Sequence, residues 1–68
     1  MTFAEWCLLD ADDGENLIEL HVNGRLRFRA GEAVPMWQVE ILKPMELAED
    51  PVLENGIWKV NLKGAYHE

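Results

Sequence analysis

The chain has 68 residues, of which 49% are hydrophobic, and a formal net charge of −7 at pH 7. This length allows one small domain, residues 1–68, and the apolar content is too high for a disordered chain. No apolar run approaches the roughly 18 residues of a membrane helix, the start lacks the positive region of a signal peptide, and the acidic charge disfavours nucleic acid and membranes as partners. We therefore expect a soluble, cytoplasmic protein.

A single cysteine, Cys7, excludes an internal disulfide framework. Residues 1–24 carry six acidic side chains and no Lys or Arg, whereas Arg25, Arg27 and Arg29 place three positive charges within five residues. A small domain gains stability from association. We expect a protein partner with a basic surface, or assembly into a homo-oligomer.

In chain order, the sequence first predicts strands over Phe3–Asp10, Asn16–His21 and Arg25–Ala30, joined as a meander. The turn at Asn23-Gly24 sets the second hairpin. Asn-Gly commonly forms a two-residue type I′ turn, but that turn would mix apolar and charged side chains on one face. We therefore predict a three-residue loop with Gly24 in the left-handed conformation. The resulting pairs are Leu20 with Leu26, Ile18 with Phe28, Glu19 with Arg27, and His21 with Arg25.

The same kind of triplet, any residue followed by Asp or Asn and then Gly, recurs at Asp12–Gly14 and Glu54–Gly56. The same loop length is predicted for both hairpins. The pairs that follow are Trp6 with Leu20, Leu8 with Ile18, and Val52 with Trp58.

The second half of the chain predicts another strand over Met36–Leu42, where apolar and polar residues alternate. One or two helical turns are expected between Pro44 and Pro51. The closing strand is Ile57–Leu62, and the end of the chain after it, residues 64–68, is expected to fray.

These elements predict an all-β fold: a five-stranded antiparallel meander or a small, partly closed barrel, with one short helix before the last strand. The expected core lies on the apolar faces of the strands. Its residues are Trp6, Leu8, Ile18, Leu20, Leu26, Phe28, Val39, Ile41, Val60 and Leu62.

The arginines of the third strand alternate along it and could bind a phosphate or only pair with acids. In the predicted register Glu19 lies across from Arg27, and Glu5 comes near Arg25, so cross-strand pairing explains much of this row. Arg29 is the exception, because it faces Leu17 beside Leu9.

Candidate chemical sites fail on spacing. A calcium loop of the EF-hand type needs Gly at its sixth position and Glu at its twelfth, but Gly14 falls one place early and His21 stands twelfth. Cys7 and His21 are expected on the same outer face, without a third group to orient the histidine, and His67 is remote. Four zinc ligands are not present at a recognisable spacing. We expect no catalytic residue, no metal and no cofactor.

The pattern favours a non-catalytic protein-binding module, such as an accessory or regulatory subunit or an inhibitor. Acidic residues would steer a basic partner, and two apolar patches would supply the buried contact. The acidic residues are Asp10, Asp12, Asp13 and Glu15; the patches are Leu9, Leu17 and Arg29, and Val34, Met36 and Trp37. Two alternatives remain open: a nucleic-acid mimic that inhibits a nuclease or another defence enzyme, and an enzyme that depends on Cys7.

Overall fold

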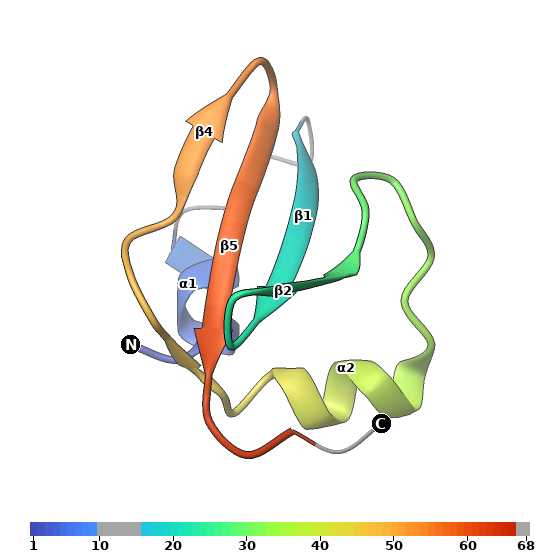
Figure 1. The fold of residues 1–68 in the computed structure, drawn as a ribbon, viewed down its shortest axis with the longest axis vertical. Helices are drawn as coiled ribbons and strands as arrows, with labels where there is room; N and C mark the ends of the chain where they lie inside the picture. The colour runs from blue at the N-terminus through green and yellow to red at the C-terminus, as the bar shows by residue number, and fades with distance from the viewer. Residues whose placement is uncertain (10–15, 67–68) are drawn as a thin grey trace.

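The computed structural model describes residues 1–9 and 16–66, and of Leu9 it describes only the backbone. This part of the chain forms two short helices and five strands (Figure 1). In chain order they are α1 (Phe3–Leu9), β1 (Leu17–Val22), β2 (Arg25–Phe28), α2 (Met36–Leu42), β3 (Glu46–Leu47), β4 (Val52–Glu54) and β5 (Ile57–Lys63). Neither of these helices has the length and apolar character needed to cross a membrane.

The sheet is mixed and open, with β1 and β5 as a parallel pair at its centre. β2 pairs antiparallel with β1, and on the other side β4 and β3 pair antiparallel with the first and last parts of β5. The predicted sheet-rich domain with five strands is confirmed, but the all-antiparallel meander and the barrel are wrong. A parallel pair needs a long crossover connection, which the chain between β1 and β5 supplies. Turn signals report only neighbouring strands, so they could not reveal this pairing.

Asn23 and Gly24 form the two-residue turn that the sequence pattern disfavours. Their φ angles are 51° and 82°, as a type I′ turn requires. The expected conflict between apolar and charged side chains is resolved by a β-bulge, which sets Leu20 opposite Phe28 instead of Arg27. The predicted pairs of Leu20 with Leu26, Ile18 with Phe28, Glu19 with Arg27, and His21 with Arg25 are wrong.

The last hairpin repeats this turn. Asn55 and Gly56 have φ angles of 52° and 77°, so the loop again has two residues rather than three. Leu53, and not Val52, lies opposite Trp58. The hairpin itself is confirmed, but its register is one residue away from the prediction. The third triplet, Asp12–Gly14, lies outside the described residues.

Phe3–Leu9 is a helix and not the predicted strand, so its pairing with β1 does not exist. A capping box at Thr2 and Glu5 explains why. The Glu5 N–H donates to Thr2 Oγ1 at 3.2 Å, while Glu5 Oε1 accepts hydrogen bonds from the Thr2 N–H at 2.9 Å and the Thr2 hydroxyl at 3.0 Å. Glu5 is thus bonded to the start of its own helix, and the strand pairing that was predicted to bring it near Arg25 does not exist.

Met36–Leu42 is also a helix, although alternation predicts a strand. The same stretch contains Gln38 and Leu42, four residues apart and both buried, so it fits the helical period as well. The helix ends at Lys43, directly before Pro44. Pro44 therefore follows a helix instead of starting the predicted one, and the chain continues into β3.

Both helices contribute to the core on one face of the sheet. Figure 1 shows α1 behind the β1–β5 pair and α2 across its lower end. Trp6 stands edge-on to Trp58, with ring centroids 5.2 Å apart, and stacks on Phe3 at 6.1 Å. The buried apolar residues are Phe3, Trp6, Leu20, Val22, Leu42, Met45, Val60 and Leu62.

Two residues of the predicted core are exposed: Leu8 at 76% and Leu26 at 47%. In a helix, residues two apart point in nearly opposite directions, so α1 buries Trp6 and turns Leu8 to solvent. Leu26 pairs with His21, and both lie on the face of the sheet opposite α1 and α2.

The C-terminal segment is held in place, against the predicted fraying. Asn23 binds the backbone of Gly64 through two hydrogen bonds. The Tyr66 hydroxyl donates to Gln38 Oε1 at 2.7 Å, and the Arg27 guanidinium lies 5.2 Å from the centre of the Tyr66 ring. Residues 67–68 lie outside the described part of the chain.

Candidate functional site: an apolar groove between the helices

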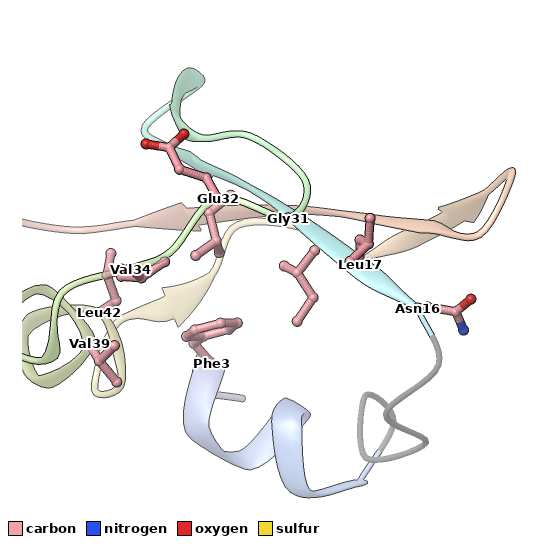
Figure 2. A pocket seen from close by; sticks show the side chains of 10 residues that line it. Phe3, Asn16, Leu17, Gly31, Glu32, Val34, Val39 and Leu42 are labelled. Atoms are coloured by element: carbon pink, nitrogen blue, oxygen red, sulfur yellow. The ribbon is translucent and has the colours of Figure 1, made fainter.

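A groove of about 350 Å³ lies between the two helices, β1 and the loop that follows β2 (Figure 2). Seven of its ten lining residues have apolar side chains. They are Phe3, Leu17, Ile18, Leu20, Val34, Val39 and Leu42. The remaining three are Asn16, Gly31 and Glu32.

Each wall of the groove comes from a different element. Figure 2 shows Phe3 rising from α1, and Val39 and Leu42 on α2 at the other side. The loop closes the groove opposite α1, where the Glu32 N–H donates to the Arg29 carbonyl at 3.0 Å and Glu32 Oε1 accepts from the Arg29 N–H at 3.0 Å. The groove is therefore a gap in the packing between helices, bordered by a turn with its own hydrogen bonds.

The groove contains one residue from each of the two predicted contact patches. Leu17 of the first patch and Val34 of the second both line the groove. Met36 and Trp37, at the start of α2, are 70% and 56% exposed, and Arg29 is exposed on the bordering loop. The side chain of Leu9 and all of Asp10, Asp12, Asp13 and Glu15 lie outside what the structure describes.

The arginines do not form the predicted row. Arg27 is the extra residue of the bulge, so the alternation with its neighbours is broken. Glu19, its predicted partner, instead binds His21 on its own strand, with Oε1 and Nε2 2.7 Å apart. This hydrogen bond lowers the pKa of the Glu19 carboxyl.

Cys7 and His21 lie on opposite faces of the sheet, which contradicts their predicted common face. Cys7 packs against the core from α1, whereas His21 lines a more polar pocket of about 390 Å³ together with Lys59 and Asn61. Burial raises the pKa of the Cys7 thiol. Within residues 1–9 and 16–66, no three His, Cys, Asp or Glu side chains are grouped so that they could hold a metal ion.

The sequence patterns missed most of the groove because its α1 and α2 walls were predicted as strands. One local signal was available: Thr2-x-x-Glu5 is a capping box and places Phe3 at the start of a helix. No comparable signal connects Val39 to Phe3, since their approach depends on packing between distant segments.

No protein-family model, curated protein or solved structure matches this chain. Its function is therefore inferred from the geometry of the site. Pockets that bind ligands typically measure about 300–1,000 Å³ and have mainly apolar linings, and the groove between α1 and α2 meets both criteria.

Proposed function

We propose that this chain is a non-catalytic protein-binding module that receives an apolar side chain of a basic partner in the groove between α1 and α2. The observation that carries this proposal is the groove's apolar lining, with Leu17 at its rim 51% exposed. A half-exposed leucine beside a gap in the packing leaves apolar surface that a partner's side chain would bury, and such burial drives association.

The charge of the chain supports a basic partner. Glu32 lines the groove, and Glu5 and Glu40 are exposed on the two helices that form its walls. With a net charge of −7, the module would attract a segment in which Lys or Arg flanks an apolar residue. Attraction of this kind raises association rates and selects the partner, while the apolar contact provides most of the affinity.

Met36 and Trp37 are exposed apolar residues at the start of α2, outside the lining of the groove. Methionine and tryptophan are both enriched at protein interfaces, and the Trp37 side chain is 56% exposed at the start of α2. Met36 lies about one helical turn before Val39, so a partner segment that fills the groove and continues along that side of α2 would cover Met36.

A titration with short peptides tests this proposal. The panel contains peptides with one Leu, Phe or Trp flanked by lysines, and matched peptides flanked by glutamates. We expect the lysine-flanked peptides to shift the methyl resonances of Leu17, Val34 and Val39 saturably, and the glutamate-flanked peptides to bind more weakly. Absence of shifts across the panel, or equal binding of both sets, would contradict the proposal.

The salt dependence of this binding separates the proposal from nucleic-acid mimicry. Apolar anchoring keeps most of its affinity at high ionic strength, whereas binding through charge alone is screened. If the affinity vanishes at high salt and does not depend on the apolar residue of the peptide, the mimicry alternative replaces the groove.

A further inference from the structure

The two ends of α2 are attached to the rest of the molecule in different ways. At its C-terminal end, the Ala4 N–H donates to the Lys43 carbonyl at 3.1 Å, and the Phe3 N–H donates to the Met45 carbonyl at 2.9 Å. These bonds tie that end to the start of α1. Among the described residues, the first turn of α2 has one hydrogen bond to another element, from the Tyr66 hydroxyl to Gln38 Oε1 at 2.7 Å.

The segment that carries Tyr66 is itself anchored on the β1–β2 hairpin. Asn23 Nδ2 donates to the Gly64 carbonyl at 2.9 Å, and the Gly64 N–H donates to Asn23 Oδ1 at 3.2 Å. Beyond it, Arg27 lies over the Tyr66 ring at 5.2 Å. Residues 64–66 therefore run from the end of β5, past the hairpin, to α2 (Figure 1).

The position of α2 affects the shape of the groove, because Val39 and Leu42 of α2 line it together with Phe3 of α1. Gln38 is buried with 6% exposure and directly precedes Val39. If the bond at Gln38 is released, the first turn of α2 keeps no other hydrogen bond to a distant segment among the described residues, so it can move about the end fixed at Lys43 and Met45 and carry Val39 with it.

We propose that residues 64–66 form a strap, and that its hydrogen bond between Tyr66 and Gln38 holds α2 closed and sets the width of the groove. The strap is a conformational device within this fold. Its value for partner binding rests on the proposed function, but its existence does not, so the test below uses no partner.

The test is amide hydrogen exchange in Tyr66→Phe, which removes the hydroxyl and keeps the ring under Arg27. The variant leaves the buried Gln38 amide without its donor, and a lost or unsatisfied hydrogen bond of this kind corresponds to about a tenfold change in an opening equilibrium. We expect exchange of the Gln38 and Val39 amides, which donate to the Pro35 carbonyl in the first turn of α2, to rise about tenfold, with the Val60 and Leu62 amides of β5 unchanged. Lys59→Gln, on exposed β5 surface away from the strap, should leave α2 exchange as it is.

A second variant tests whether the Tyr66 hydroxyl acts on α2 through Gln38 or only stabilises the domain as a whole. Gln38→Met replaces the side-chain amide with an apolar group that accepts no hydrogen bond from Tyr66. The double variant Gln38→Met/Tyr66→Phe should therefore show the same α2 amide exchange as Gln38→Met alone. The strap proposal would be contradicted if Tyr66→Phe left the amide exchange rates of α2 unchanged, or raised the exchange rates of α2 and β5 equally. A further increase in the double variant would also contradict it. If peptides bind the groove but Tyr66→Phe does not change α2 exchange, the proposed binding function stands and only the strap is excluded.

Discussion

The side chain of Asn23 binds the backbone of Gly64, 41 residues away, through both of its polar atoms: Nδ2 donates at 2.9 Å and Oδ1 accepts at 3.2 Å. Asn23 has a φ of 51°, a conformation that asparagine tolerates better than most residues. The backbone N–H of Asn23 also donates to the Leu62 carbonyl at 2.7 Å. One turn residue thus shapes the β1–β2 hairpin and joins it to the end of β5.

Replacing Asn23 should cost more stability than replacing its counterpart in the last hairpin. Asn55 has nearly the same φ, 52°, so Asn23→Gly and Asn55→Gly change the backbone entropy equally. Only Asn23→Gly also removes the two bonds to Gly64. We expect it to lower the free energy of unfolding by about 1 kcal/mol more than Asn55→Gly does, measured by urea denaturation. Equal losses would mean that the bonds to Gly64 contribute nothing.

The capping box predicts that α1 depends on the Thr2 hydroxyl. Thr2→Ala removes the acceptor for the Glu5 N–H and should lower the free energy of unfolding by about 1 kcal/mol. Thr2→Ser keeps a hydroxyl and should retain most of that stability. Denaturation curves of Thr2→Ala that coincide with those of the unchanged protein would show that the box does not hold the helix.

Acid should weaken the same box. Hydrogen bonds from the Thr2 N–H and hydroxyl hold the pKa of Glu5 below its ordinary value of 4.5. A lowered pKa in the folded state means that Glu5 contributes stability above its unfolded pKa and loses it as the pH falls through the folded pKa. We expect Glu5→Gln to flatten the acid part of a plot of unfolding free energy against pH. A steeper acid part in that variant would reverse the assigned sign.

Cys7 should react slowly. Burial raises the pKa of its thiol, although Lys43 acts in the opposite direction, so the reactive thiolate is scarce near neutral pH. We expect iodoacetamide to alkylate Cys7 in the folded protein more slowly than it alkylates free cysteine. Once the protein is unfolded, the two rates should be equal. Faster reaction of the folded protein would revive the enzyme alternative that depends on Cys7.

Local patterns predicted the strands β1, β2 and β5 well, because alternation and turn residues act over a few positions. The turn at Asn23 shows where such reasoning stops. Side-chain segregation favoured a three-residue loop, but the chain keeps the common type I′ turn and restores the apolar pairing of Leu20 with a bulge three residues beyond Gly24, at Arg27. A bulge has no strong sequence signal, and its gain comes from packing on the finished sheet.

The groove could be predicted only in part for a similar reason. Leu17 and Val34, which the sequence predicts as contact residues, both line the groove, since apolar positions next to turns can be recognised locally. Phe3 and Val39 line the same groove only because two short helices pack on one face of a sheet whose central strands are parallel. That arrangement depends on contacts between segments more than thirty residues apart.

The most direct test of the groove as a binding site compares two leucines of similar exposure. Leu17 lines the groove and is 51% exposed, whereas Leu53 on β4 is 46% exposed and does not line it. Losing half of a leucine's burial would weaken the binding of a lysine-flanked, leucine-containing peptide roughly fivefold. Calorimetric titration should show this loss for Leu17→Ser and an unchanged affinity for Leu53→Ser. Equal effects of the two substitutions, or none from Leu17→Ser, would contradict the account.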